Sequence, residues 1–298
     1  MFKMAESGRL IAMKLELTEI RKLTITALFS DDVLFEQLVL KGGNALSLVH
    51  GISPRDSLDL DFSLETDFEN LGDILARMEH ALASRFRVVG LIPFDAKLAP
   101  KPLEQRENQQ PRWGGYQLEF KLIEETRHQS LRADSDRLRR EAFVVRPNQR
   151  RVFRVDFSKY EYTTGKVRAE IDDYTIYVYP PAMLAIEKLR ALCQQMEDYA
   201  PTGRNRHPRA RDFFDIFIII SKTGLRLGSS ENLDLMKMIF AAKKVPISLL
   251  GKLAEQRDYH RVDWPNVRAT VAEPLEEFDF YFDFVLREIE PLHSLWIK

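Results

Sequence analysis

The stretch KGGNALSLVHGISPRDSLDLDFS, residues 41–63, decides the fold. It opens with the glycine pair Gly42 and Gly43 and closes with Asp59 and Asp61, which alternate with apolar residues. This alternation predicts a strand with one buried face. Successive side chains of a strand point to opposite faces and rise about 3.3 Å per residue, so the two carboxylates would share a face roughly 7 Å apart. Their oxygens can converge on one divalent metal ion or on a pair of ions about 4 Å apart.

The glycine pair predicts a backbone that binds phosphate. Glycine has no Cβ, so N–H groups at the start of a helix can approach a triphosphate closely. Lys41 and Asn44 flank the pair. Hard cations such as Mg²⁺ or Mn²⁺ prefer carboxylate oxygens together with the phosphate oxygens of a substrate. The stretch therefore predicts that a metal ion and a nucleoside triphosphate (NTP) meet at one place.

Further motifs downstream extend this pattern. R-x-S-x-D-L-D-F runs from Arg55 to Phe62, IEKLRAL from Ile186 to Leu192, and RARDFFD from Arg209 to Asp215. In this order they resemble the nucleotidyltransferase superfamily and, more narrowly, the AbiEii/AbiGii toxin-type nucleotidyltransferases of bacterial toxin–antitoxin and abortive-infection systems. The resemblance implies an α/β (α+β) fold, with a mixed sheet of the nucleotidyltransferase type flanked by helices and followed by a C-terminal helical region.

The resemblance also implies a role for each motif residue. Asp59 and Asp61 would bind the metal ion, together with a third acid on a neighbouring strand that assists deprotonation of the attacking hydroxyl. Val155-Asp156-Phe157 has the required form, so Asp156 is the candidate for this acid. The residues implied to contact the nucleotide are Lys41, Gly42, Gly43, Asn44, Arg55, Ser57 and Lys188.

The last motif, RARDFFD, contains two acids, Asp212 and Asp215, at i and i+3 on one face of a helix. Asp212 is the favoured catalytic residue, paired with Lys188, and Asp215 is the second choice. Purely structural roles stay open for both acids. Asp212 could interact favourably with a helix dipole, and Asp156 could accept hydrogen bonds from the amides of a turn. Asp172 and Asp173 compete with Asp156, but they are predicted to form a turn before the strand 174–179.

The function that this resemblance implies is transfer of a nucleotide from an NTP to an acceptor such as the 3′ end of a tRNA. The protein would then be a toxin whose partner is an antitoxin protein. Two alternatives remain: nucleotidylation or phosphorylation of a protein target, and a catalytically inactive module that only binds nucleotide.

Composition agrees with an ordinary globular protein. The formal charge is −1, and 45% of the 298 residues are hydrophobic. No apolar run approaches the roughly 18 residues that a membrane span needs, and a cytoplasmic location without membrane contact is expected. The single cysteine excludes an intrachain disulfide. The length favours two parts, a catalytic domain over 1–180 and a helical domain over 181–298 that contributes to the active site.

Periodicity and turn residues predict the individual elements. Helices are expected over 17–36, 43–50, 68–86, 130–141 and 275–289, from Pro181 and from Ala210. Strands are expected over 37–41, 57–63, 87–92, 116–123, 151–157 and 174–179. A loop or an extended excursion is expected around Pro93, Pro100, Pro102 and Pro111, and core positions are expected at Met236, Met238 and Phe240.

Arginine is enriched in two places. Residues 124–154 contain nine arginines and five acids, and residues 204–211 contain four more arginines. Guanidinium groups suit phosphate oxygens because they can bind them in a bidentate way. These patches are the predicted contacts for tRNA or another polyanion, although arginine runs are also common on solvated helix faces.

Overall fold

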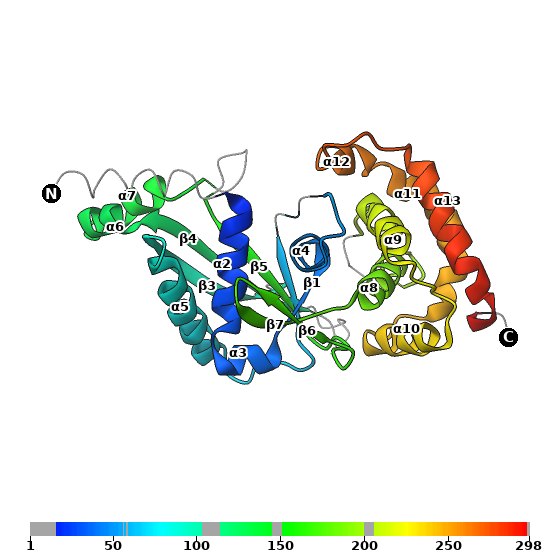
Figure 1. Cartoon of the computed structure of the whole chain (residues 1–298), viewed down its shortest axis with the longest axis horizontal. Coiled ribbons are helices and arrows are strands. Elements are labelled where there is room, and N and C mark those ends of the chain that lie inside the picture. Colours follow the sequence, from blue (N-terminus) through cyan, green and yellow to red (C-terminus); the bar gives the residue numbers. More distant parts are fainter. Residues whose placement is uncertain are drawn as a thin grey trace.

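A mixed seven-stranded sheet forms one half of the molecule (Figure 1). The computed structural model describes residues 16–55, 57, 59–102, 114–144, 151–199 and 206–296. Within these ranges the strand order is β3-β4-β5-β2-β1-β7-β6. The strands are β1 (Val39–Lys41), β2 (Leu60–Ser63), β3 (Leu91–Lys101), β4 (Gly115–Glu124), β5 (Phe153–Ser158), β6 (Val167–Ile171) and β7 (Tyr174–Val178).

Helices flank the sheet and form the rest of the molecule. In Figure 1, α2, α3 and α5 lie over the sheet, whereas the elements from α8 onward gather at the opposite end. The helices that precede α8 in the chain are α2 (Leu17–Phe29), α3 (Asp32–Gln37), α4 (Gly42–Asn44), α5 (Leu71–Arg87), α6 (Glu125–Leu131) and α7 (Ser135–Glu141). Those from α8 onward are α8 (Pro181–Cys193), α9 (Ala210–Thr223), α10 (Ser230–Ala242), α11 (Arg257–Arg261), α12 (Trp264–Arg268) and α13 (Phe278–Ile289). The predicted α/β fold with a C-terminal helical region is confirmed.

The pairing of β2 with β5 sets the geometry of the sheet centre. The two strands are parallel, with Asp61 opposite Asp156 and Phe62 opposite Phe157. The two phenylalanine rings are buried and stack with centroids 5.6 Å apart. Because side chains alternate along a strand, Asp61 and Asp156 project from the opposite face. The buried stack therefore anchors the two strands and keeps the two acids level with each other.

A row of polar residues crosses the sheet at this level. β1 runs antiparallel to β2 and places Lys41 opposite Asp61. On the other side, β4 runs antiparallel to β5 and places Gln117 opposite Asp156. Residues paired across a ladder share one face of the sheet. Four neighbouring strands thus contribute Lys41, Asp61, Asp156 and Gln117 to one continuous row.

The first part of the proline segment is extended rather than a loop, so the second of the two expected alternatives is confirmed there. β3 continues through Pro93 and Pro100, which pair with Leu122 and Tyr116 of β4. β3 is an edge strand, where proline can sit because its missing N–H need not serve a second neighbour. Pro111 lies outside the described residues.

Other boundaries move for local reasons. The helix predicted over 17–36 is divided into α2 and α3, and the Asp31 side chain caps α3 by accepting from the N–H groups of Val33 and Leu34. The predicted turn at Asp172 and Asp173 is confirmed, since both have positive φ, at 47° and 66°. They join β6 to β7 as a two-residue hairpin loop. β6 itself was not predicted.

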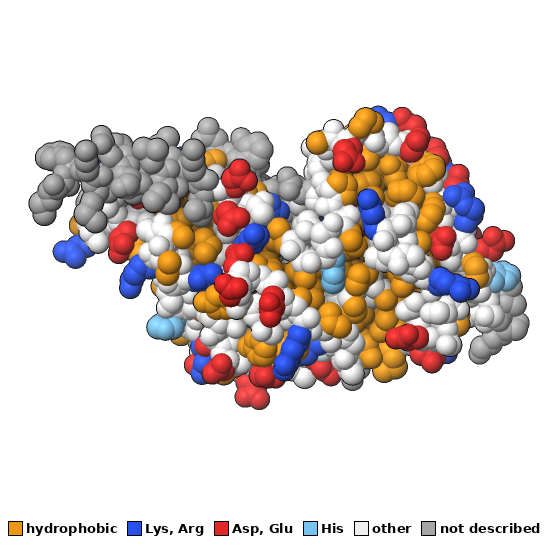
Figure 2. Space-filling model, viewed as in Figure 1, with side chains coloured by type: hydrophobic (Ala, Val, Ile, Leu, Met, Phe, Trp, Pro, Cys, Tyr) orange, Lys and Arg blue, Asp and Glu red, His pale blue; other side chains and the backbone are white. Residues whose placement is uncertain are grey.

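A continuous hydrophobic core includes residues from both ends of the molecule. The boundary predicted at residue 180 falls between β7 and α8. Met236 and Phe240 are buried as expected, but Met238 is 52% exposed and the prediction for it is wrong. Two residues along a helix correspond to a turn of about 200°, so Met238 lies on the opposite side of α10. None of the helices in the described ranges is long and apolar enough to cross a membrane. Figure 2 shows acidic and basic side chains over both halves of the face viewed.

The stacked phenylalanines lead to a stability prediction. Substitution of Phe62 by Ala should lower the free energy of unfolding by about 3 to 5 kcal/mol, because it leaves a cavity beneath the acids. Substitution of Phe280, which is 43% exposed, should cost less than about 1 kcal/mol. Urea denaturation of both variants measures the difference, and equal losses would contradict an anchoring role for the stack.

Candidate active site

A cavity of about 540 Å³ lies where the polar row of the sheet meets the helical region. Its walls come from the sheet, from the loops around α4 and β2, and from α8 and α9. Of the eleven residues predicted for the site, Asn44 alone is missing from the lining. The ten that line it are Lys41, Gly42, Gly43, Arg55, Ser57, Asp59, Asp61, Asp156, Lys188 and Asp212.

Asp61 and Asp156 form the carboxylate pair on the cavity floor. Burial raises the pKa of Asp61 to about 6; Lys41 opposes this rise and Asp156 adds to it. Asp156 accepts a hydrogen bond from Gln117 Nε2 at 2.7 Å, and its other oxygen pairs with Lys101 Nζ at 2.8 Å. Two carboxylates on neighbouring strands, one of them poorly solvated, form a local concentration of negative charge that favours a cation.

Asp59 differs from its prediction. It was expected on the strand with Asp61, but β2 begins at Leu60. The Asp59 carbonyl accepts a hydrogen bond from Asn44 Nδ2 at 2.7 Å. This segment is therefore held by a side chain rather than by the backbone hydrogen bonds of the sheet. Its position on the cavity wall is as expected. No cluster of three or more His, Cys, Asp or Glu side chains suitable for a metal ion occurs in the described ranges.

The donor set can still fit a magnesium ion. Mg²⁺ is commonly bound by one or two carboxylates, with substrate phosphates and water completing the shell. Asp61 and Asp156 satisfy the protein's part of that arrangement, and both side chains provide only oxygen ligands. Asp59 lies two residues before Asp61 on the same wall.

The glycine pair has a steric role that sequence reasoning did not predict. Gly42 has φ +72°, and a Cβ there would lie 2.5 Å from Asp61 Oδ2. A Cβ on Gly43 would lie 2.7 Å from Ser57 Cβ. Both glycines therefore allow the loop to pass directly over the strand of Asp61 and over the segment that precedes this strand. Contact between their N–H groups and phosphate stays a prediction.

Asn44 is a structural residue in this fold. Its side chain is fully buried, donates to the Asp59 carbonyl and accepts from Arg21 Nη1 at 3.2 Å. Asn44 is not part of the cavity lining, and its contact with the nucleotide stays a prediction. A buried amide satisfies its hydrogen bonds internally because an unpaired polar group is costly.

The motifs IEKLRAL and RARDFFD meet in a largely buried group that we call the Lys188 cluster: Arg55, Lys188, Arg209, Asp212 and Asp215. Lys188 Nζ lies 2.6 Å from Asp215 Oδ2 and 3.2 Å from Asp212 Oδ1. Arg55 binds Asp215 through two nitrogens at 3.0 and 3.2 Å. Arg209 binds the second oxygen of Asp212. The predicted pairing of Lys188 with Asp212 is present, and Asp215 shares the same lysine.

Asp212 and Asp215 differ in their access to the cavity. Burial by itself would raise the pKa of Asp212, but Arg209 and Lys188 hold it well below its usual range. Asp212 lines the cavity, whereas Asp215 does not. Asp215 serves to hold Arg55 and Lys188 in place, so the geometry favours Asp212 as the acid that can act on a ligand.

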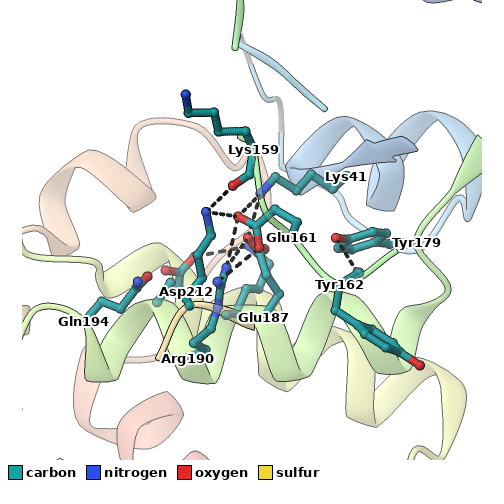
Figure 3. Close-up of polar contacts among 12 residues, drawn as sticks. Lys41, Lys159, Glu161, Tyr162, Tyr179, Glu187, Arg190, Gln194 and Asp212 are labelled. Carbon is teal, nitrogen blue, oxygen red and sulfur yellow. Dashed lines mark hydrogen bonds and ion pairs between the residues drawn. The ribbon is translucent and has the colours of Figure 1, made fainter. Parts of the chain in front are cut away.

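A second buried group, which we call the Glu161 cluster, was largely missed from the sequence: Lys41, Glu161, Glu187, Arg190 and Lys243 (Figure 3). Lys41 Nζ lies 2.9 Å from Glu187 Oε1 and 3.4 Å from Glu161 Oε1. Arg190 contacts the same two glutamates, and Lys243 lies 3.4 Å from Glu161. Glu187 and Arg190 flank Lys188 in the motif IEKLRAL and could have been found there, but no local signal marks Glu161 or Lys243.

The arginine-rich segment over 124–154 is partly neutralised within the fold. Arg127 and Arg137 both pair with Glu141, and Arg139 pairs with Asp95. Arg146, Arg150 and Arg204, which belong to the predicted patches, lie outside the described residues. RNA contact through these patches stays a prediction. The two arginines of the second patch that line the cavity are Arg209 and Arg211.

Comparison with known proteins adds independent information. A family model described as "Nucleotidyl transferase AbiEii toxin, Type IV TA system" matches residues 25–284. No curated protein sequence matches the chain. A solved structure titled "Crystal structure of putative nucleotidyltransferase from H. pylori" is 15% identical, covers 94% of each chain and has a TM-score of 0.44. An antigenic nucleotidyltransferase-like protein from Paracoccidioides brasiliensis is 14% identical over 84% of this chain and 93% of its own, with a TM-score of 0.37.

The glycine loop leads to a matched pair of substitutions. Gly42 and Gly51 both have positive φ, but a Cβ at Gly51 meets no atom within 4 Å. Gly51→Ala should lose about 1 to 2 kcal/mol of stability from backbone strain alone. Gly42→Ala should lose at least about 1 kcal/mol more, because the methyl group displaces the Asp61 carboxylate. Thermal or urea unfolding measures both, and equal losses would show that the loop does not press on Asp61.

His260 ties α11 to the start of α9. The buried imidazole accepts from the Arg209 N–H at 3.0 Å through Nδ1, and burial lowers the pKa of His260 to about 4. In the unfolded chain His260 has an ordinary histidine pKa near 6.5. Between about pH 6.5 and pH 4 it is therefore protonated in the unfolded chain but neutral in the folded protein. Folding stability is therefore lost as the pH falls through this window.

His260→Asn tests this dependence, because the Asn side-chain oxygen can accept from Arg209 but cannot titrate. Relative to the variant, the wild type should lose about 1 kcal/mol between pH 7.5 and pH 5.5. Other titrating groups cancel in the difference between the two proteins. Parallel pH profiles of the melting temperature would overturn the assignment of a neutral buried imidazole.

Proposed function

This chain belongs to the AbiEii nucleotidyltransferase family of toxin–antitoxin systems, and we propose that it transfers a nucleotide from an NTP to the 3′ end of a tRNA with the help of Mg²⁺. The protein would act as the toxin of its system, in the cytoplasm, and an antitoxin protein would counteract it. In this proposal residues 1–180 form the catalytic domain, and residues 181–298 form a helical domain that completes the site.

One observation carries the proposal. Asp61 and Asp156 are register partners on parallel strands, and both line the cavity. This is the arrangement that brings two carboxylates to one metal ion without distortion of the sheet. When bound, Mg²⁺ neutralises phosphate charge and orients the α-phosphorus for in-line attack.

The remaining residues have complementary roles. Asp156, in contact with Lys101 and Gln117, would accept the proton of the attacking hydroxyl group. Lys188, fixed by Asp212 and Asp215, would offer its positive charge to the nucleotide's phosphates. A point charge that is already held in place loses little conformational entropy on binding, which favours the transition state. Asp212 would orient Lys188 at the cavity wall.

The acid pair leads to a direct activity test. Asp61→Asn and Asp156→Asn should each lower nucleotide transfer at least about 100-fold, because the metal ion loses one of its two anionic ligands. Asp172→Asn, in the β6–β7 hairpin, should leave activity unchanged. Each purified protein is incubated with each labelled NTP and Mg²⁺, with total RNA in one reaction and cell protein in another. Label transferred at wild-type rate by the double variant of Asp61 and Asp156 would overturn the proposed site.

The same assay separates the acceptors. Label in the tRNA fraction supports the proposal, and label in cell protein would instead show nucleotidylation of a protein target. Binding of NTP without transfer to either fraction would show an inactive nucleotide-binding module. Loss of growth inhibition on expression of the Asp61 and Asp156 variants would connect the chemistry to the toxin role.

A further inference from the structure

The two buried charge clusters on the cavity wall differ in how well their cations are satisfied. In the Lys188 cluster, each cation has a close carboxylate partner, and Arg55 binds Asp215 in the bidentate form that gives strong pairs. Two acids are thus shared among Arg55, Lys188 and Arg209 with good geometry. None of the buried side-chain nitrogens of this cluster lacks a hydrogen-bond partner.

The Glu161 cluster has unused donors. Arg190 is 2% exposed, yet its Nε and Nη1 have no hydrogen-bond partner, although Nη1 lies 3.0 Å from Glu161 Oε2. Lys41 and Lys243 approach Glu161 only to 3.4 Å. Buried guanidinium nitrogens without acceptors are rare because each one costs free energy. Arg190 therefore has donors available to a ligand in the cavity, Nε above all.

The charge of the Glu161 cluster points to an anion. Three cations, Lys41, Arg190 and Lys243, face two carboxylates, Glu161 and Glu187, so one positive charge is left over. The Lys188 cluster has the same surplus, so the unpaired donors of Arg190 make the difference between the two clusters. Burial, which Glu161 does not fully offset, lowers the pKa of Lys243 to about 8. All five side chains line the cavity. A bound anion would meet the unpaired donors and compensate the remaining charge.

The location of this cluster identifies the kind of anion. Lys41 is the register partner of Asp61, so the cluster begins one strand away from the carboxylate pair. Figure 3 shows Lys41 and Arg190 converging on Glu161, and Lys243 approaches the same carboxylate. Lys41 comes from β1, Arg190 from α8 and Lys243 from the end of α10. Several cations around one point suit the adjacent oxygens of a diphosphate group better than a single carboxylate.

We propose that the Glu161 cluster is a diphosphate site that receives the two terminal phosphates of the NTP, the group that leaves as pyrophosphate. Arg190 and Lys243 would contact its oxygens, and Glu161 would hold both cations at the correct separation. The inference rests on the proposed function, since it assigns the orientation of the nucleotide in that same cavity. Lys243, far from every sequence motif, would then be a binding residue supplied by the helical region.

Inorganic pyrophosphate is the probe for this site. Its binding to the full chain is measured by titration calorimetry in Mg²⁺ at pH 7, with wild type, Lys243→Met and Lys243→Arg. Lys243→Met should weaken binding at least about tenfold, as expected for loss of a charged donor, and Lys243→Arg should restore most of the affinity. Lys237→Met, an exposed position on the same helix, should bind as the wild type does.

The pH dependence provides a second readout. The charged groups around Lys243 are Glu161, Arg190 and Lys41, and its ammonium group also donates to the Lys159 carbonyl. Between pH 7 and pH 9 the wild type should lose affinity relative to Lys243→Arg, because the arginine stays charged. The titration of pyrophosphate itself is common to both proteins and cancels in the comparison.

The outcomes separate the site from the proposed function. Unchanged pyrophosphate affinity in a folded Lys243→Met variant overturns the diphosphate site, even if nucleotide transfer is observed. Weakened affinity with rescue by arginine supports the site, even if transfer fails. Nucleoside monophosphate and orthophosphate serve as comparison ligands. Equal dependence of all three ligands on Lys243 would show a general anion site and would overturn the assignment to a diphosphate.

Discussion

The parallel pairing of β2 with β5 is the constraint on which the rest of the structure depends. It sets Asp61 beside Asp156 on one face and Phe62 beside Phe157 on the other. Two buried or half-buried carboxylates repel each other, so this arrangement needs a strong anchor on the opposite face. The stacked rings provide that anchor through hydrophobic burial, which requires no particular charge state. The strand pair can therefore hold two acids close together before any cation is present.

Buried ion pairs then connect the helical region to the sheet. Arg55, on the loop before β2, binds Asp215 on α9, and Lys41 on β1 binds Glu187 on α8. A buried charge that loses its partner costs about 3 to 5 kcal/mol, so these pairs specify which helix face meets the sheet. The same pairs form the walls of the cavity. The helices are thus positioned and the site is closed by one set of interactions.

The two charge clusters on the cavity wall differ in how completely their donors are paired. In the Lys188 cluster the cations are held by acids at short distances, which favours a fixed geometry. In the Glu161 cluster Arg190 Nε and Nη1 have no hydrogen-bond partner, although Nη1 lies 3.0 Å from Glu161 Oε2. Family membership and the carboxylate pair point to nucleotidyl transfer. The uneven pairing indicates in addition which end of the cavity suits the phosphate tail.

The sequence by itself determined the order of the motifs, the alternation around Asp61 and Asp156, the glycine pair and the mixed α/β class. These features follow from local periodicity and from the backbone freedom of glycine, both of which are readable in a short window. The strand position of Asp59 and the burial of Met238 were misjudged, because a neighbouring segment and the opposite helix face decided their environments. Only the tertiary structure decided the partners of Lys41, Arg55 and Lys243. A buried charge must find an opposite charge, and which one it meets depends on packing between segments that lie far apart in the chain.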